Sequence, residues 1–149
     1  MYLATVTRPD ISYTVSRLSH YSKDPREVHW TAVKRLLRYL KGTMDYSLKF
    51  KRTEGKLNAC TDASWSTTPD GKSYSGYLVK IGESLVGWKS GRQKLVALST
   101  MEAELISACD CVCAVKWTHS LSEELCEHSS IKKPTDIKTD SELLQYCLL

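Results

Sequence analysis

The period of the hydrophobic pattern changes at Gly42, and this change constrains the fold more than any other feature of the sequence. Before Gly42, apolar residues recur every three or four positions, which is the spacing of one helix face. After it, short apolar segments alternate with polar residues or end at turn signals, which indicates strands. From Thr100 the helical spacing returns. The pattern therefore predicts a helical front portion followed by an α/β portion.

Two helices are predicted in the front portion. The first lies within residues 8–21. The second has Asp24 as its cap, Pro25 and Glu27 in its first turn, and Gly42 as its stop. The apolar stripes that we expect to be buried are Ile11, Val15 and Leu18 in the first helix, and Trp30, Val33, Leu37 and Leu40 in the second.

The segment after the second helix leads into the α/β portion. Tyr46, Leu48 and Phe50 alternate with polar neighbours, which predicts a strand. The polar run "KRTEGK" that follows is typical of a turn, and we place the domain boundary there. The expected domains are a helical extension, 1–55, and an α/β domain, 56–149.

The α/β domain is predicted to contain a mixed sheet, with an antiparallel three-strand meander plus a parallel strand and helices packed on it. Gly82 and Glu83 are a hairpin signal between two of the strands. A helix separates the first strand from the last, so these two are candidates for a parallel pair. The predicted strands are 57–62, 75–81, 84–90, 94–99 and 134–140, and the predicted helices are 100–126 and 141–149. In the first of these helices an apolar stripe recurs at three- and four-residue intervals, formed by Leu105, Ala108, Val112, Val115 and Leu121 or Leu125.

Acidic residues end two of these strands and open the long helix. Asp62 and Asp140 would lie at the same edge of the sheet, because parallel strands end there together. Glu104 would reach that edge from the first turn of the helix, whereas Glu102 would favour the helix dipole and face solvent. Taken singly, an acid at a strand end or helix start is more often a cap or turn residue. Together they predict a group of three converging carboxylates.

Three converging carboxylates repel one another unless a cation neutralises them, so they favour a hard divalent metal. Magnesium suits all-oxygen ligands, and a pair of such ions about 3.5–4 Å apart promotes hydrolysis of a phosphodiester. The group therefore indicates a nuclease. A sugar-kinase or actin-like ATPase on a related sheet would need Gly-rich phosphate loops, and the sequence contains none.

Charge is distributed unevenly along the chain. Residues 1–60 hold 12 Lys and Arg against 5 Asp and Glu, a formal +7, while residues 61–149 hold 9 against 12, a formal −3. A basic half is either an ordinary solvated face or a surface for nucleic acid. No apolar run approaches the ~20 residues that cross a bilayer, and no secretory signal opens the chain, so we expect an intracellular protein. The candidate phosphate contacts are Lys34, Arg35, Arg38, Lys89, Arg92 and Lys94.

Several segments of the chain resemble copia-type retrotransposon polyproteins. The resemblance to the ribonuclease H domain of that family is carried by "TDAS" at 61–64, "SGYLV" at 75–79, "VALSTMEAELISA" at 96–108 and "IKTDS" at 137–141. The segment that links the reverse transcriptase to this domain is similar to "TRPDISYTVSRLS", "HWTAVKRLLRYLKGT" and "GWKSGRQKLVALST".

This resemblance implies a ribonuclease H-like fold and a set of functional residues. Asp62 corresponds to the metal-binding aspartate of the first strand, Glu104 to the glutamate of the first helix, and Asp140 to the aspartate of the fourth strand. Glu104 rather than Glu102 is chosen by matching "AELISA" to the family pattern x-E-L-x-x-A. The implied cofactor is Mg²⁺, with Mn²⁺ as an alternative.

The implied reaction is hydrolysis of the RNA strand of an RNA–DNA hybrid during reverse transcription, leaving a 3′-hydroxyl and a 5′-phosphate. The implied partners are the hybrid and an upstream reverse transcriptase domain, with no membrane. The expected location is cytoplasmic, in a virus-like particle, or nuclear.

The chain departs from the family pattern in three places. Ser64 stands where a second acid is common, and Ser141-Glu142 stand where Asn-Gln is common. The sequence stops at Leu149, before the last strand, the final helix and the fourth aspartate of the family, so we expect catalysis by this chain to be weak or absent. The competing hypothesis is a non-catalytic remnant or host-adopted module that binds nucleic acid or protein.

Overall fold

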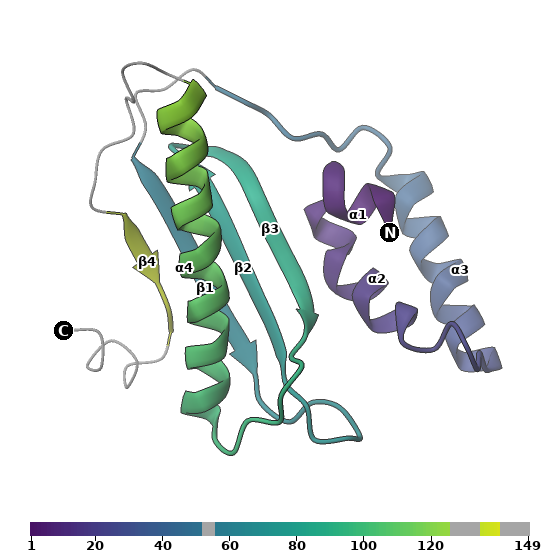
Figure 1. Cartoon of the computed structure of the whole chain (residues 1–149). Helices are drawn as coiled ribbons and strands as arrows, with labels where there is room; N and C mark the ends of the chain where they lie inside the picture. Colours follow the sequence, from purple (N-terminus) through teal and green to yellow (C-terminus); the bar gives the residue numbers. More distant parts are fainter. Residues whose placement is uncertain (52–55, 126–134, 141–149) are drawn as a thin grey trace. The chain divides into compact units, whose positions relative to one another are not determined.

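The computed structural model describes residues 1–51, 56–125 and 135–140. The chain divides into two compact units, Met1–Leu48 and Lys49–Leu149. The first contains helices, and the second contains a sheet with one long helix (Figure 1). Among the described residues, no helix is both long enough and apolar enough to span a membrane.

The helical unit contains the two predicted helices and a short additional one. The short helix α1 spans Tyr2–Val6, and a 3₁₀ turn, η1, spans Pro9–Ile11. Helix α2 spans Ser12–Ser19, and α3 spans Glu27–Gly42. Pro9 at the first position of η1 fits a helical start, because a backbone N–H at that position would have no acceptor within the helix.

The predicted cap of α3 at Asp24 is wrong. The helix begins at Glu27, so Arg26 is the capping residue, with extended backbone angles. The Arg26 N–H donates to His29 Nδ1 at 3.1 Å, and the His29 ring stacks on Tyr21 with centroids 3.9 Å apart. The first turn is thus closed by an imidazole in the role that a carboxylate or amide usually takes.

The predicted apolar stripe of α3 is only partly buried. Val33 and Leu40 are half-buried, but Trp30 and Leu37 are 54% and 56% exposed. Helix α2, at eight residues, is half as long as the sixteen-residue α3 and covers only part of its apolar face.

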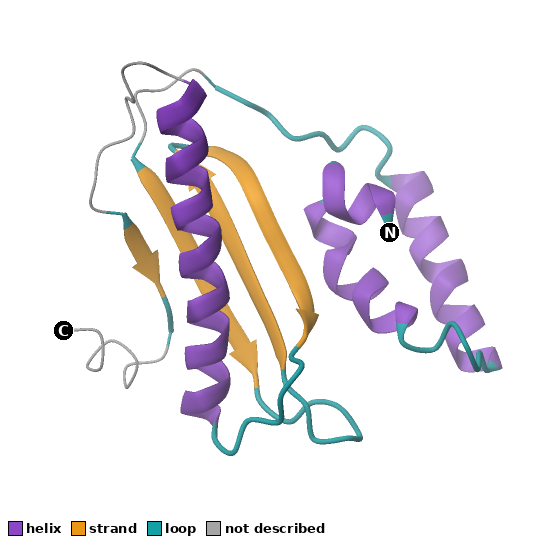
Figure 2. Cartoon of the chain, in the orientation of Figure 1, coloured by secondary structure: helices purple, strands orange, loops and turns teal. Residues whose placement is uncertain are grey.

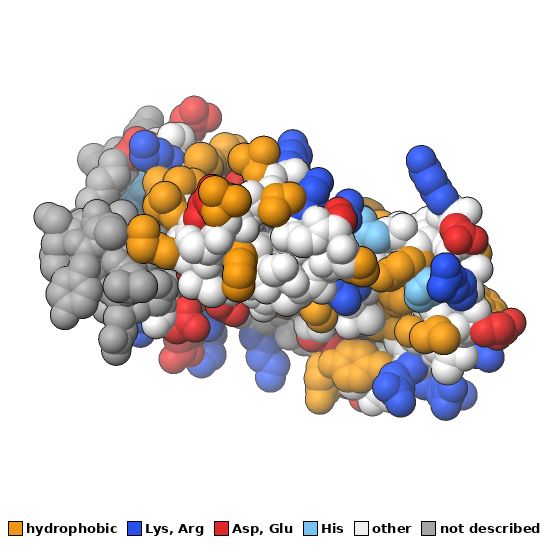
Figure 3. Space-filling model, turned by 90° about the horizontal axis from the view of Figure 1, so that it is seen from below, with side chains coloured by type: hydrophobic (Ala, Val, Ile, Leu, Met, Phe, Trp, Pro, Cys, Tyr) orange, Lys and Arg blue, Asp and Glu red, His pale blue; other side chains and the backbone are white. Residues whose placement is uncertain are grey.

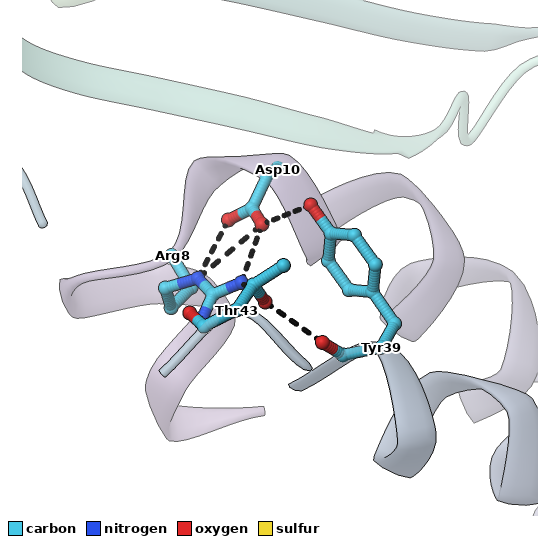
Figure 4. Close-up of polar contacts among 4 residues, drawn as sticks. All are labelled: Arg8, Asp10, Tyr39 and Thr43. Carbon is cyan, nitrogen blue, oxygen red and sulfur yellow. Dashed lines mark hydrogen bonds and ion pairs between the residues drawn. The ribbon is translucent and has the colours of Figure 1, made fainter. Parts of the chain in front are cut away.

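A polar cluster centred on Arg8 joins the start of the helical unit to the end of α3 (Figure 4). The Arg8 guanidinium donates to the Asp10 carboxylate, at 2.7 Å from Nη2. It also donates to the carbonyl and the hydroxyl of Thr43, at 3.0 and 2.7 Å. Tyr39 donates its hydroxyl to Asp10 at 2.8 Å, and the rings of Tyr39 and Tyr46 each lie 5.7 Å from the guanidinium carbon. Arg8 is therefore buried, and each of its three guanidinium nitrogens donates a hydrogen bond.

The second unit contains a four-stranded mixed sheet (Figure 2). Its strands are β1 (Leu57–Ser64), β2 (Tyr74–Ile81), β3 (Ser84–Arg92) and β4 (Asp136–Lys138), in the order β3-β2-β1-β4. The first three form the antiparallel meander, and β4 pairs with β1 in parallel. This mixed α/β architecture confirms the predicted fold class and is consistent with a ribonuclease H-like fold.

Helix α4 (Thr100–Leu125) packs on β1 and β2. The predicted apolar stripe of α4 is buried only at Ala108 and Val115, and the other buried positions of the helix carry mostly small side chains. Its larger members are exposed: Leu105, Val112, Leu121 and Leu125. Burial raises the pKa of the Cys111 thiol to about 11, so this side chain stays neutral in the core. The buried core of the unit consists of Leu57, Ala59, Val79, Cys111 and Val115.

Two predicted strands are absent. Residues 46–50 form no strand, although the Lys51 N–H reaches Ser84 Oγ at 3.0 Å. Residues 94–99 form no strand either, because the chain leaves the sheet after β3 and crosses to the start of α4. Of that apolar run only Ala97 is buried. The predicted helix 141–149 lies outside the described residues.

Candidate metal centre

The pairing of β1 with β4 brings two of the predicted acids to the same place. Cys60 is paired with Lys138, so the register, continued by two residues, sets Asp62 opposite Asp140. Carboxylate oxygens of Asp62, Glu104 and Asp140 all lie within 4.8 Å of one another. We call these three residues the carboxylate cluster. The structure thus brings together the side chains that the sequence analysis placed at one sheet edge.

Glu104 is the buried member of the cluster. It lies in the first turns of α4 and is only 8% exposed, whereas Asp62 and Asp140 are open to solvent. Its Oε1 accepts the Ala63 N–H at 3.0 Å. Its Oε2 is buried and has no hydrogen-bond partner. A buried carboxylate oxygen without a donor is costly, unless a cation or a proton satisfies it.

Burial raises the pKa of Glu104, and the neighbouring carboxylates of Asp62 and Asp140 raise it further, against the lowering effect of the Ala63 N–H. A divalent cation between the three side chains would remove this repulsion and occupy the unpartnered Oε2. The donor set is all oxygen, which suits Mg²⁺ or Mn²⁺. The residues present therefore fit a hard metal ion.

Glu102 has a different task from Glu104. Its carboxylate accepts the Leu98 N–H at 2.6 Å, and its own N–H donates to Ser99 Oγ at 3.1 Å. Ser99 thus caps the first turn of α4 through its hydroxyl, and Glu102 binds the backbone N–H of the residue before the cap. The two acids of the "MEAEL" run divide as expected, one into the helix cap and one into the cluster.

Sequence reasoning missed a pair of hydroxyls beside the cluster. Ser107, one turn after Glu104, donates to the Asp62 carbonyl at 2.8 Å, and its Oγ lies 2.8 Å from Thr61 Oγ1. Both side chains are buried. The available signal was a serine within the sheet-facing stripe of a helix, where an apolar residue is normally expected.

The segment before α4 is also tied to the sheet by side chains that the sequence analysis did not single out for this role. Gln93 Nε2 donates to the Ala103 carbonyl at 2.8 Å and to Ser75 Oγ at 2.6 Å. Trp65 Nε1 donates to the Ala97 carbonyl at 2.9 Å. These contacts set where α4 begins relative to β1 and β2, and so where Glu104 lies.

Strand β4, which precedes Asp140, has two side-chain anchors. His119 Nε2 on α4 lies 2.7 Å from Thr135 Oγ1. Lys56 Nζ forms an ion pair with Asp136 at 2.6 Å. The strand is therefore held to both the helix and the start of β1.

The predicted phosphate contacts fall into two groups. Lys89 forms an ion pair with Asp110 at 2.7 Å, and Arg92 forms one with Asp70 at 3.0 Å, so their charges are partly neutralised. On the face shown in Figure 3, basic side chains lie interspersed with acidic and hydrophobic ones. The remaining four are exposed and form no ion pair within the described residues: Lys34, Arg35, Arg38 and Lys94.

Comparison with known proteins gives relatives for most of the chain. It is 44% identical over 126 residues to the retrovirus-related Pol polyprotein from transposon RE2 of Arabidopsis thaliana, covering 83% of this chain and 9% of that protein. It is 40% identical over 129 residues to the corresponding polyprotein from transposon TNT 1-94 of Nicotiana tabacum, covering 86% and 10%. No family model and no solved structure matches.

A third relative is of similar length. The secreted RxLR effector protein 161 of Plasmopara viticola is 41% identical over 119 residues, which cover 78% of this chain and 84% of that protein. The chain spans about a tenth of the length of the Pol polyproteins that it matches. Over most of its length it is therefore similar to a short region of the retrovirus-related Pol polyproteins of plant transposons.

Proposed function

We propose that this chain is the ribonuclease H module of a retrotransposon polyprotein, with the connection segment before it. Its substrate is an RNA–DNA hybrid, and its reaction is hydrolysis of the RNA strand during reverse transcription. The observation that carries the proposal is the carboxylate cluster with the unpartnered oxygen of Glu104. The similarity to Pol polyproteins supports an origin in a retrotransposon polyprotein and an upstream reverse transcriptase as partner. The boundary between segment and module is proposed at residues 55 and 56.

Asp62, Glu104 and Asp140 would hold Mg²⁺, or Mn²⁺ in its place. When bound, the metal supplies the Lewis acidity that favours attack of water on a phosphodiester. The Ala63 N–H orients Glu104 by occupying Oε1, which leaves Oε2 for the metal. Asp62 and Asp140 are solvent-exposed, so the substrate backbone can approach the cluster from their side.

Recognition would depend on the shape and charge of the hybrid. The 2′-hydroxyl groups distinguish the RNA strand from DNA. The exposed side chains of Lys34, Arg35, Arg38 and Lys94 are proposed phosphate contacts, and Lys89 and Arg92 would contribute only by exchanging their carboxylate partners for phosphates.

The test is cleavage of a labelled RNA–DNA hybrid in Mg²⁺ by the full chain and by Asp62→Asn. We expect weak cleavage by the unsubstituted chain and a further loss of at least 100-fold in the variant, because one ligand of the metal is weakened. Binding of the hybrid should survive the substitution. Equal product from both proteins, or none from either with binding intact, would favour a non-catalytic binding module.

A further inference from the structure

The peptide group between Asp62 and Ala63 is bonded to α4 at both of its polar atoms. Its carbonyl accepts the Ser107 hydroxyl at 2.8 Å, and its N–H donates to Glu104 Oε1 at 3.0 Å. Residues three apart lie on the same side of a helix. One side of α4 therefore sets the orientation of the peptide plane that follows the Asp62 Cα, and with it the direction of the Asp62 side chain.

The bond from Ser107 to β1 differs from the other hydroxyl bonds of this helix. Thr118 and Ser122 donate to the carbonyl four residues back in α4, which is the usual arrangement for a hydroxyl within a helix. The carbonyl four residues before Ser107 belongs to Ala103 and accepts the Gln93 side chain. The Ser107 hydroxyl instead crosses to the strand.

The position of the Ser107 hydroxyl is itself determined by its surroundings. Ser107 is fully buried, and the Thr61 hydroxyl beside it is also within reach of the Gly76 carbonyl at 3.3 Å. Each hydroxyl carries one proton, and Ser107 has three acceptors within reach: the Asp62 carbonyl and Thr61 Oγ1 at 2.8 Å, and the Gly76 carbonyl at 3.4 Å. When Thr61 donates its proton to Ser107, the Asp62 carbonyl is the nearest acceptor left for the Ser107 proton.

We propose that Ser107 is a positioning residue of the carboxylate cluster: by holding the Asp62–Ala63 peptide against α4, it keeps the Asp62 and Glu104 carboxylates in the relative placement that a divalent ion requires. The inference rests on the proposed metal-dependent function. It adds a residue that touches neither metal nor substrate and acts through the backbone of a ligand.

The test uses Mn²⁺ as the probe, with affinity measured by electron paramagnetic resonance on the full chain. Ser107→Ala should weaken Mn²⁺ binding about 10-fold, which is the low end for removing a group that orients a metal ligand. The matched control is Ser122→Ala, which removes a hydroxyl from the same helix away from the cluster and should leave the affinity within about 2-fold.

A second measurement needs no metal. Hydrogen exchange of the Ala63 amide, followed by NMR, should accelerate in Ser107→Ala and not in Ser122→Ala, because the peptide is no longer held at its carbonyl. If Ser107→Ala fails to fold, Thr61→Val replaces it. That variant keeps the bond from Ser107 to Asp62 but removes the neighbour that restrains it, so a smaller change in the same direction is expected.

The inference is overturned if Ser107→Ala matches Ser122→Ala in both Mn²⁺ affinity and Ala63 exchange. It is also overturned if Ser107→Ala lowers the melting temperature alone, which is the result for a merely structural serine. An unsubstituted chain that binds no Mn²⁺ would defeat the proposed function instead, and Ala63 exchange would still decide whether Ser107 holds this peptide.

Discussion

Glu104 and Glu102 are two residues apart on the same helix, yet their surroundings give them different chemistry. The Glu102 carboxylate accepts a hydrogen bond from a backbone N–H at the helix start. Glu104 is buried beside two other acids, with one oxygen bonded and the other unpartnered. The second arrangement is unfavourable for the isolated protein and favourable for a bound cation, because the ion reverses the sign of the local electrostatic energy.

Glu104→Gln should reduce the affinity for Mn²⁺ at least 10-fold, because it removes the buried charged ligand. The free energy of unfolding without metal should not fall, since the substitution relieves repulsion within the cluster and retains an oxygen for Ala63. Glu102→Gln is the matched control. It should leave the Mn²⁺ affinity unchanged and lower the free energy of unfolding by about 0.5 kcal/mol, because a charged cap becomes neutral. Titration with Mn²⁺ and urea unfolding measure both quantities, and equal affinities in the two variants would contradict this assignment.

Asp10 makes the helical unit sensitive to acid. The hydrogen bond from Arg8 holds the pKa of Asp10 below its usual range. A carboxyl with a lowered pKa in the folded state contributes stability that is present above the unfolded value of about 3.9 and is lost as the pH falls through the folded pKa. NMR signals of the Tyr39 and Thr43 amides should therefore report loosening below about pH 3.9. Asp10→Asn should already show this loosening at neutral pH and no further change in that acid range; retention of the acid transition would contradict the assignment.

The strands were predictable where turn residues and apolar alternation agreed. Leu57, Ala59 and Val79 follow that rule, and the Gly82 turn sets the hairpin. The segments 46–50 and 94–99 carry strand-like patterns without forming strands, because alternation says nothing about whether a partner strand is available. Pattern alone therefore identifies the meander but overestimates the number of strands.

The carboxylate cluster was predictable from topology, but the side-chain contacts that hold it in place were not. A parallel βαβ arrangement places Asp62 and Asp140 at one edge without knowledge of any side-chain contact. The buried face of α4 was predicted only in part, because hydrophobicity favours Leu105, whereas small side chains such as Ala103 and Ser107 are the ones buried. A serine in that stripe has the right size, and its hydroxyl bond becomes visible only in three dimensions.

Leu57→Ala should lower the free energy of unfolding of the sheet unit by about 3 kcal/mol, because the side chain is fully buried in the core and its removal leaves a cavity. Leu98→Ala is the matched control, since Leu98 is 85% exposed in the segment wrongly predicted as a strand. Its effect should stay within about 0.5 kcal/mol. Urea unfolding followed by circular dichroism measures both free energies. A large decrease in the free energy of unfolding of Leu98→Ala would instead support a buried strand at residues 94–99.

The basic side chains of the chain differ in how freely they can bind an anionic partner. The Lys89 and Arg92 charges already face carboxylates, while Lys34, Arg35 and Arg38 on α3 face solvent. The net charge of +4 therefore does not describe either element: in the described part of the chain, α3 carries unpaired positive charges, whereas those of β3 are partly neutralised. Binding to nucleic acid should depend on the first group more than on the second.

Replacing Lys34, Arg35 and Arg38 with Gln should flatten the salt dependence of hybrid binding. Each charge that contacts a phosphate contributes about 0.9 to the slope of log K against log salt concentration. Lys89→Gln should change the slope by much less, because Asp110 already neutralises that charge. Fluorescence anisotropy with a labelled hybrid at several salt concentrations measures the slopes, and a larger effect from Lys89→Gln would place the contact surface on the sheet instead.

Within the part of the chain that the structure describes, strand β4 joins the sheet through three residue pairs, at one end of the strand order. Two residues beyond it, Asp140 faces a carboxylate from β1 and one from α4. An ion shared by these side chains would cross-link three elements that are distant in sequence. Cation occupancy and the docking of β4 would then be reciprocally coupled, so that whatever tightens one tightens the other by the same free energy. Ionic conditions would thereby govern how completely this domain is assembled, as well as whether it reacts.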